Sequence, residues 1–195
     1  MKFVIATKNP HKVLEFERIL TPLGIEAVSQ EALGITAEAP EDAGTFAGNS
    51  LQKAMAVHLA SGLPTLADDS GLEVDALGGR PGVYSARYGG PGLTDAERYQ
   101  KLLQEMEGVG ERRARFVAAI TLVFSAEKHY SFTGICEGKI GYGPMGEGGF
   151  GYDPIFLVGD RSFSQISGAE KDAVSHRGKA LRELAEALPD ILEIV

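Results

Sequence analysis

Leu66-Ala67-Asp68-Asp69-Ser70-Gly71 places two adjacent carboxylates directly after a short apolar run that starts at Pro64. This order predicts a β-strand that ends at the acids, at the carboxyl edge of an open α/β sheet, where such sheets hold ligands. Two buried, ionised neighbours repel each other, and a divalent cation or a cluster of positive charges would relieve that repulsion. Oxygen ligands favour Mg²⁺ or Mn²⁺ over Zn²⁺. An Asp-Ser-Gly turn explains the same residues without a metal, and taken alone the stretch favours the turn.

The composition limits the classes of protein to which the chain can belong. Its 195 residues suit one domain or two small lobes, and its 44% hydrophobic and 24% charged residues are ordinary for a globular protein with a core. The single cysteine, Cys136, excludes an internal disulfide and a cysteine-based zinc site. A chain without disulfides fits a reducing compartment, and we expect a cytoplasmic protein.

Charge and hydropathy restrict the partners. A net charge of −8 argues against binding long nucleic acid through phosphate neutralisation. A bound anion would therefore need basic residues concentrated locally, with help from a metal. The apolar run at residues 3–6 is too short for a signal peptide or a membrane span, so we expect no membrane contact.

The first residues predict a strand, a tight turn and a helix. Residues 2–7 are typical of a buried strand, Asn9 is a good N-cap, and Pro10 suits the first helical position. The helix carries an apolar stripe and ends at Gly24; the stripe consists of Val13, Phe16, Leu20 and Leu23. Helix N-termini attract phosphates, so the lysines at the turn suggest an anion site. A plain strand-to-helix connection with solubilising lysines fits equally well.

The rest of the chain alternates between predicted strands and helices. We expect five further strands, at residues 26–29, 72–77, 116–125, 129–140 and 155–158. We expect three further helices, at residues 45–61, from the capping box at Thr94 to about 106, and from about Ser175 to Pro189, which ends it. We treat residues 1–195 as a single domain, in which the charged segment 107–113 is the candidate boundary between two lobes.

Four segments together offer what a nucleoside triphosphate needs. Residues 7–12 supply phosphate donors, and the acids near Glu41 together with Asp68-Asp69-Ser70 supply metal ligands. Residues 150–153 with 175–177 supply an aromatic face and groups that can read the edge of a base.

Five stretches resemble the inosine triphosphate pyrophosphatase family, whose members split nonstandard purine nucleoside triphosphates. They are Ala6-Thr7-Lys8-Asn9-Pro10-His11-Lys12, Ala67-Asp68-Asp69-Ser70-Gly71-Leu72, Pro81-Gly82-Val83-Tyr84-Ser85-Ala86-Arg87-Tyr88, Gly148-Gly149-Phe150-Gly151-Tyr152-Asp153-Pro154 and Ser175-His176-Arg177-Gly178-Lys179-Ala180. Each alone is weak, but five in order with similar spacing over nearly the whole chain are highly specific. One departure is Lys8, where the family often has glycine; the lysine adds a charge of the sign that a phosphate site uses.

The resemblance implies an α/β fold in which helices flank a mixed central sheet, with two lobes and a substrate cleft between them. It also implies a homodimer that depends on Mg²⁺ or Mn²⁺ and hydrolyses ITP, dITP and XTP to the nucleoside monophosphate and pyrophosphate. By position, Asp69 is the implied proton acceptor and, with Glu41, a metal ligand. The implied substrate-binding residues are Thr7, Lys8, Asn9, Pro10, His11, Lys12, Lys53, Ser70, Phe150, Gly151, Tyr152, Asp153, Lys171, His176 and Arg177.

Alternatives remain for single residues and for the whole chain. Capping of the last helix explains His176 as well as base contact does, and solvated positions explain His11 and Lys53. A nucleotide-binding regulatory module without turnover would use the same phosphate and base groups, but it has no need for Glu41 and Asp69 around a metal. A septum-inhibitor-type pyrophosphatase of related fold would act on other nucleotides, and the motifs at 150–153 and 175–177 favour the purine enzyme.

Overall fold

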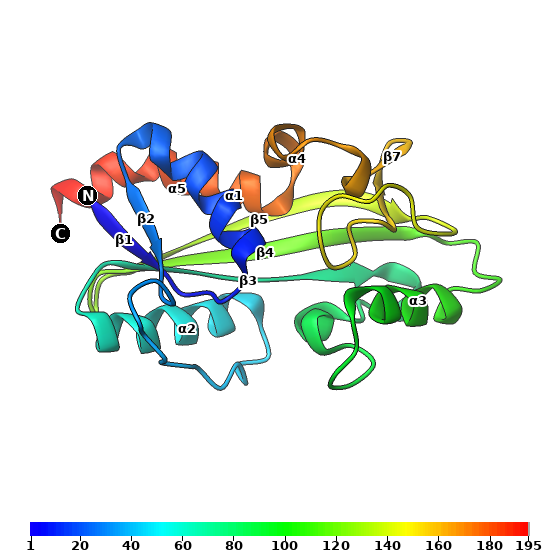
Figure 1. Ribbon diagram of the computed structural model, residues 1–195, viewed down its shortest axis with the longest axis horizontal. Coiled ribbons are helices and arrows are strands. Elements are labelled where there is room, and N and C mark those ends of the chain that lie inside the picture. Colours follow the sequence, from blue (N-terminus) through cyan, green and yellow to red (C-terminus); the bar gives the residue numbers. More distant parts are fainter. Residues whose placement is uncertain (195) are drawn as a thin grey trace.

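The computed structural model describes residues 1–194 and contains a seven-stranded mixed sheet in the order β2-β1-β3-β4-β5-β6-β7 (Figure 1). Its strands are β1 (Lys2–Ile5), β2 (Glu26–Ser29), β3 (Thr65–Val74), β4 (Arg113–Val123), β5 (His129–Ile140), β6 (Phe156–Val158) and β7 (Arg161–Ser162). β1 runs parallel to β2 and β3, and the other neighbours are antiparallel. The predicted mixed α/β fold is confirmed.

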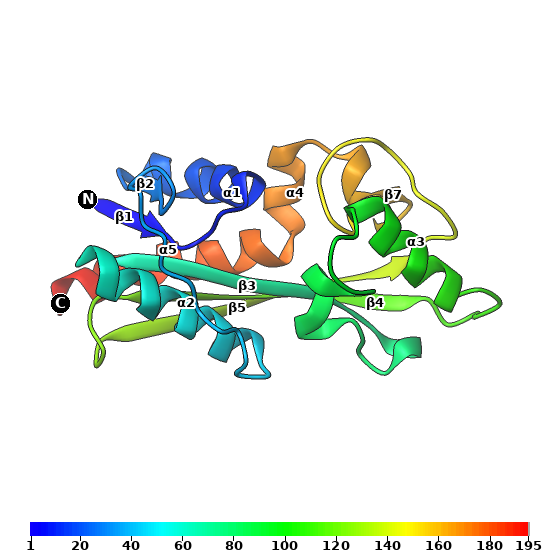
Figure 2. The ribbon, with the colours of Figure 1, turned by 60° about the horizontal axis from the view of Figure 1, so that its bottom comes forward.

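Residues 1–194 form five α-helices and four short 3₁₀-helices in addition to this sheet. The α-helices are α1 (Pro10–Leu20), α2 (Phe46–Ser61), α3 (Asp95–Glu105), α4 (Gly168–Val174) and α5 (His176–Glu193), and the 3₁₀-helices are η1 (Thr21–Leu23), η2 (Asp75–Leu77), η3 (Gly82–Arg87) and η4 (Phe163–Gln165). Figures 1 and 2 show α1 and α5 on one side of the strands and α2 on the other. Among the helices formed by residues 1–194, none combines the length and hydropathy needed to cross a membrane.

Strand β3 runs without a break through the two acids. The predicted strand end at Asp68 and the separate strand at 72–77 are wrong, because residues 65–74 pair continuously with β4 and Asp75–Leu77 form a 3₁₀-helix. β1 pairs with β3 only at Thr65 and Leu66. Along Asp68–Leu72 the side of β3 that faces away from β4 therefore pairs with no other described strand. This open edge lies beside the turn that follows β1.

Successive residues of β3 face opposite sides of the sheet. Leu66 packs with α1 and α5, whereas Ala67 packs with α2. Asp68 and Asp69 continue the alternation: Asp68 contacts charged residues of α1 and α5, and Asp69 contacts polar residues of α2. Leu72 lies on the same face as Leu66 but packs with α3. Helices α1 and α5 thus cover one end of this face of the sheet, and α3 covers the other end of the same face.

Helix α5 deviates from prediction at its C-terminal end and depends on a glycine beneath it. It continues past Pro189 to Glu193, so the predicted end at Pro189 is wrong. The lost backbone hydrogen bond is tolerated because Leu188 and Ile191 are buried on either side of the proline. Near the other end of α5, a Cβ at Gly134 of β5 would collide with backbone atoms of His176. Glycine at this position lets α5 lie directly on the sheet.

The charged segment that follows α3 leads straight into β4, and the lobe boundary at 107–113 stays a prediction.

Candidate active site

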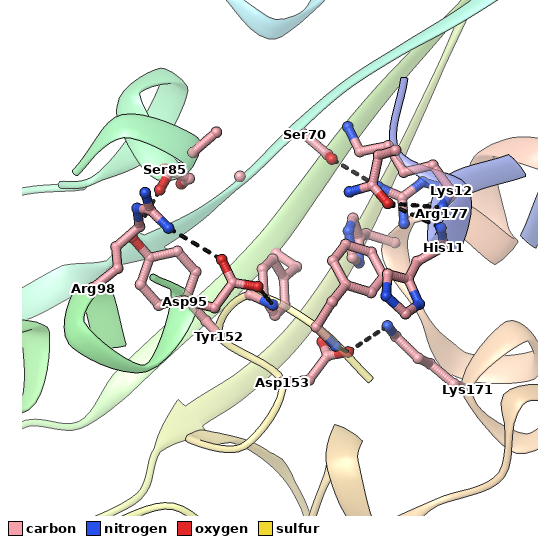
Figure 3. Close-up of a pocket in the computed structure, with 17 residues that line it drawn as sticks. His11, Lys12, Ser70, Ser85, Asp95, Arg98, Tyr152, Asp153, Lys171 and Arg177 are labelled. Atoms are coloured by element: carbon pink, nitrogen blue, oxygen red, sulfur yellow. Dashed lines mark hydrogen bonds and ion pairs between the residues drawn. The ribbon is translucent and has the colours of Figure 1, made fainter. Parts of the chain in front are cut away.

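A cavity of about 230 Å³ lies on the shared face, between the α1–α5 pair and α3. Figure 3 shows Ser85, Asp95 and Arg98 at one end of it and His11, Lys12 and Arg177 at the other. Eleven of the predicted substrate residues line it: Asn9, His11, Lys12, Ser70, Phe150, Gly151, Tyr152, Asp153, Lys171, His176 and Arg177. The structure therefore brings together segments from both ends of the chain, and we refer to this space as the base-side cavity.

A second cavity of about 300 Å³ lies on the other side of the turn that follows β1. It contains four more predicted residues: Thr7, Lys8, Glu41 and Lys53. Lys8 forms an ion pair with Glu38 at the edge of this space. The turn contributes Thr7 to this cavity and Asn9 to the first, so the two cavities lie on either side of the same short segment. We refer to the second space as the phosphate-side cavity.

The local sequence explains the turn. The Asn9 side chain accepts hydrogen bonds from the backbone N–H groups of His11, at 2.9 Å, and Lys12, at 3.4 Å, and caps α1 as predicted. Pro10 occupies the first helical position, where its missing N–H costs nothing. The helix therefore starts at the border of the two cavities, with its positive dipole end toward them.

The loop at 150–153 is fixed to three different elements. Asp153 accepts a hydrogen bond from Lys171 of α4 at 2.7 Å and a second from the Phe150 N–H at 3.0 Å. The Gly151 N–H donates to Asp95 of α3 at 2.8 Å. The Tyr152 hydroxyl donates to the backbone carbonyl of Ser85 in η3 at 2.9 Å. Burial raises the pKa of the Asp153 carboxyl despite the nearby Lys171. This loop is thus held in place before any ligand arrives.

Phe150 presents the aromatic face predicted for the base, and His11 lies against it. The two rings are stacked with centroids 5.1 Å apart and an interplanar angle of 13°. The ammonium of Lys171 lies 4.5 Å from the centroid of the Phe150 ring. A base that stacks on the same face must therefore displace the His11 ring, which places His11 at the site.

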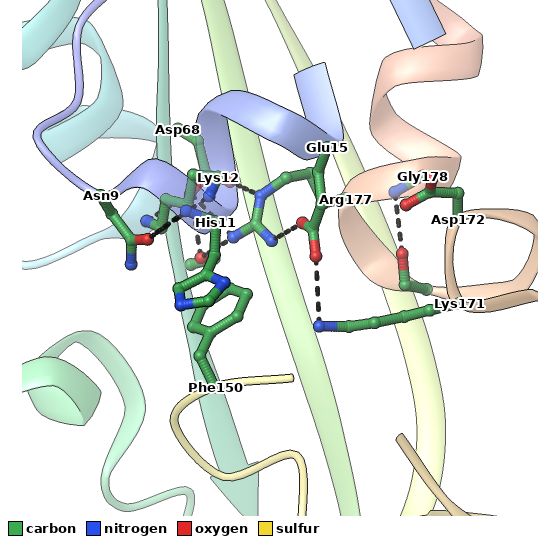
Figure 4. Close-up of polar contacts among 12 residues, drawn as sticks. Asn9, His11, Lys12, Glu15, Asp68, Phe150, Lys171, Asp172, Arg177 and Gly178 are labelled. Carbon is green, nitrogen blue, oxygen red and sulfur yellow. Dashed lines mark hydrogen bonds and ion pairs between the residues drawn. The ribbon is translucent and has the colours of Figure 1, made fainter. Parts of the chain in front are cut away.

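A buried network of charges forms the floor of the base-side cavity (Figure 4). Arg177 donates four hydrogen bonds: two to Asp68 at 3.1 and 3.2 Å, one to Ser70 at 2.8 Å and one to Glu15. The Lys12 ammonium lies 2.5 Å from the Asp68 carboxylate. Although burial opposes ionisation, Arg177 and Lys12 hold the pKa of Asp68 well below its ordinary value. Asp68 is therefore a permanently charged anchor for two cations.

His176 lies in the same cavity as a neutral, incompletely bonded ring. It stacks on Phe116 at 4.7 Å and 11°, and burial, followed by the charge of Arg177, lowers its pKa well below the ordinary value. Its buried Nδ1 has no hydrogen-bond partner within residues 1–194. Ser175, whose hydroxyl accepts from the Gly178 N–H at 3.1 Å, caps α5. Capping therefore does not account for His176, whereas a ligand polar group would.

The two predicted metal ligands face each other across Lys53. Its ammonium lies 2.8 Å from Asp69 Oδ1 and 3.4 Å from Glu41 Oε1. The other oxygen of Asp69 accepts from the Asn49 amide at 3.1 Å. Although burial opposes the charge, these carboxylates, led by Asp69, raise the pKa of Lys53. Lys53 is thus an ion-paired residue of the site.

Glu41 adopts an unusual backbone conformation. Its φ of 51° is the only positive φ of a non-glycine residue within residues 1–194. Such a conformation costs about 1–3 kcal/mol and persists where the surroundings enforce it, often at functional sites. Here Arg87 donates to the Glu41 carbonyl at 3.4 Å and lies 4.0 Å from its carboxylate.

The donor set at this point suits Mg²⁺ bound together with a substrate. Within residues 1–194 no three His, Cys, Asp or Glu side chains gather closely enough to hold a metal alone. Mg²⁺ commonly uses one or two carboxylates, with water and phosphate oxygens completing its octahedron. Glu41 and Asp69 supply those carboxylates, and the Lys53 ammonium between them shows that the position accommodates a cation. The residues present therefore fit the ion.

Comparison with known proteins agrees with this geometry. The sequence profile of the Ham1 family matches residues 3–187. The chain belongs to the Ham1 family. The dITP/XTP pyrophosphatase of Thermus thermophilus is 50% identical over 194 residues, which cover 97% of this chain and 93% of that protein. The dITP/XTP pyrophosphatase of Bacillus subtilis is 44% identical over 189 residues, covering 95% of this chain and 96% of that protein.

Solved Ham1 structures share the fold. The Ham1 protein of Coxiella burnetii superposes with a TM-score of 0.89 at 38% identity, and the match covers 97% of this chain and 99% of that one. The Staphylococcus aureus Ham1 protein gives a TM-score of 0.87 at 36% identity, with coverage of 97% and 99%. The mixed sheet and its flanking helices are thus common to Ham1 proteins.

Several residues of this Ham1 site carry no signal in the sequence. Glu15 is outside the apolar stripe predicted for the first helix, and Asn49 is outside the apolar face predicted for residues 45–61, yet both are buried. Asp95 belongs to a capping box, a local motif that gives no hint of its bond to Gly151. Ser85 does lie in the stretch 81–88 that carries the family resemblance, but nothing in that stretch shows that its backbone carbonyl accepts from Tyr152. Only the tertiary structure identifies these supporting residues.

Proposed function

We propose that this Ham1 protein hydrolyses ITP, dITP and XTP to the nucleoside monophosphate and pyrophosphate, and so removes nonstandard purine nucleotides from the nucleotide pool. The observation that supports this most is the pair of cavities on either side of the turn at Thr7–Asn9. One offers an aromatic ring and the His176 Nδ1, which has no partner among residues 1–194, and the other offers lysines and carboxylates. The names of the relatives point to the same substrates.

In this mechanism the purine enters the base-side cavity and stacks on Phe150, while the phosphates cross the open edge of β3. Lys12, Lys53 and the N-terminus of α1 bind the phosphate oxygens. Attack of water at the α-phosphorus meets the repulsion of a polyanion, so positioning and electrostatics dominate the catalysis. Asp69, oriented by the Asn49 amide, accepts the proton of the attacking water.

Glu41 and Asp69 would hold Mg²⁺. This ion supplies neutralisation of the phosphate charge and a lowered pKa for water. Assembly as a homodimer and the division into two lobes are further predictions from the family resemblance. The cytoplasmic location is predicted from the cysteine content, and the lobe boundary near residues 107–113 is predicted from the charged segment.

Removal of divalent cations should abolish turnover. Excess chelator should stop pyrophosphate release from ITP, and an excess of Mg²⁺ over the chelator should restore it. The Glu41 and Asp69 carboxylates add negative charge beside the triphosphate, and a divalent cation has to neutralise it. The control is chelator that is already saturated with equimolar Mg²⁺. It should leave pyrophosphate release unchanged, because it removes no further cation from the assay. Undiminished release in excess chelator would contradict the metal assignment.

The base should decide which triphosphates are hydrolysed. Hypoxanthine and xanthine carry an oxygen at position 6, which can accept from a donor such as His176 or a loop amide, whereas adenine presents an amino group there. An unsatisfied buried donor costs about 1–3 kcal/mol, and sites built on such bonds discriminate strongly. We expect kcat/KM for ITP, dITP and XTP to exceed that for ATP by at least about tenfold.

GTP and the pyrimidine triphosphates should also be poor substrates. Guanine shares the 6-oxo group, and close packing around Phe150 would have to reject its 2-amino group. Pyrophosphate release across this panel also tests the alternatives. Tight binding of ITP with no product would favour the regulatory module, and better turnover of nucleotides other than ITP, dITP and XTP would favour the septum-inhibitor-type enzyme.

A further inference from the structure

The Lys53 ammonium occupies the space between the two carboxylates that would hold a metal. It lies 2.8 Å from Asp69 Oδ1 and 3.4 Å from Glu41 Oε1, and it donates to the Asp68 carbonyl at 3.3 Å. These are three oxygen atoms of the kind that Mg²⁺ selects. The side chain is only 16% exposed, so the ammonium is held in the site and does not sample solvent freely.

A divalent cation and this ammonium exclude each other from the same place. Two positive charges a few ångströms apart repel strongly in a partly buried site, where water screens them poorly. The carboxylates bring two negative charges, and Lys53 already balances one of them. Arg87, 4.0 Å from the Glu41 carboxylate, balances part of the other. Without a nucleotide, little negative charge is left for a second cation.

The phosphate-side cavity offers the ammonium another position. Lys53 lines this space of about 300 Å³ together with Thr7 and Lys8. A phosphate oxygen bound there is a new acceptor for the ammonium, and a flexible four-carbon stem lets it move. Once Lys53 has turned to the phosphate, both carboxylates are free to bind a metal.

We propose that Lys53 keeps divalent cations away from Glu41 and Asp69 until a nucleotide arrives, and then transfers its ammonium to the phosphates. This inference rests on the proposed metal-dependent function. It makes the binding of cation and nucleotide mutually dependent, so each tightens the other by the same factor. The protein would take up its metal with the substrate and would hold little of it beforehand.

Mn²⁺ titration of the full chain without nucleotide tests the proposal, with free Mn²⁺ followed by electron paramagnetic resonance. Lys53→Gln removes the charge and keeps a polar side chain that is one atom shorter, and it should bind Mn²⁺ at least about tenfold more tightly than the parent protein. Lys53→Arg, which keeps the charge, should bind as weakly as the parent. Lys139→Gln on β5 changes the net charge equally at a distant, exposed site and should leave the affinity unchanged.

If the proposal is correct, the Mn²⁺ affinity gained by Lys53→Gln comes from binding to the carboxylates that Lys53 contacts. Combining Lys53→Gln with Glu41→Gln should remove the gain. Equal Mn²⁺ affinity of the parent and Lys53→Gln would overturn the proposal, as would a gain that survives the Glu41 change. If Lys53→Gln does not fold, Lys53→Met keeps the aliphatic stem without the charge, and the same titration decides.

Different results would contradict the metal-dependent function and the role given to Lys53. Hydrolysis of ITP by the parent protein in excess chelator would contradict the metal-dependent function itself. Hydrolysis that needs Mg²⁺, together with no change in Mn²⁺ affinity on removing the Lys53 charge, would contradict only the role given to Lys53.

Discussion

Replacing Asp69 with asparagine should lower kcat for ITP hydrolysis by about 10²–10⁴, the usual contribution of a positioned acid or base. The change removes the proton acceptor and one of two metal carboxylates while keeping the shape of the side chain. The oxygen of the new amide accepts from Lys53 or from Asn49, and the other of these two hydrogen bonds is lost. A loss of about 1–3 kcal/mol should leave the fold intact, although Asp69 is only 6% exposed. Steady-state pyrophosphate release at saturating ITP and Mg²⁺ measures the effect.

Asp75→Asn is the matched control for this experiment. Asp75 follows the same strand, and its carboxylate lies at the surface, 3.7 Å from Arg113. Its replacement should leave kcat unchanged. Thermal unfolding of both variants would show whether either loses the fold. A kcat of Asp69→Asn equal to that of the parent would exclude Asp69 from the reaction.

Removing the guanidinium of Arg177 should have the largest effect on stability. Arg177→Met keeps most of the side-chain volume but leaves the carboxylates of Asp68 and Glu15 buried, with fewer cations to neutralise them. Breaking a buried ion pair from one side costs about 3–5 kcal/mol. The loss should appear in urea unfolding as a lower midpoint, with a slope that stays nearly constant if the change acts on stability alone.

Arg18→Met is the matched control for Arg177→Met. It removes an arginine that is also ion-paired but is partly exposed, so it tests whether burial of the pair determines the loss of stability. Arg18 makes two hydrogen bonds with Asp172, at 2.5 and 2.9 Å, but its side chain is 39% exposed. Exposed pairs contribute about 0–1 kcal/mol, so this variant should unfold close to the parent. Equal losses for the two arginine variants would show that the buried network is no more important than a surface pair.

Local signals predicted most elements correctly because short-range contacts fix them. Asn9 and Pro10 start α1, and Thr94 and Glu97 form both bonds of the predicted capping box. The errors at Asp68 and Pro189 share one cause. Each residue type usually interrupts regular structure, and here contacts remote in sequence override that tendency: ion pairs satisfy the buried acid, and packing of the core holds the last turn of α5.

The candidate site was predictable where a residue belongs to a motif. The segments around Asn9, Phe150 and His176 meet in one cavity, as the family resemblance implies. Their supports were not predictable, because they act across the fold. Glu15 bonds to Arg177 at a separation of 162 residues, and no spacing rule connects such positions.

The alternation of Asp68 and Asp69 along β3 restricts how this protein can change over time. Because the two acids face opposite sides of the sheet, substitutions beside the base-side cavity, beneath α1 and α5, need not touch the proposed metal ligand beneath α2. Changes of length are different. A single codon inserted before Asp68 would shift the strand by one residue and turn each acid toward the other's partners. Genetic drift can therefore alter this strand by point substitution, whereas selection should remove insertions and deletions within it.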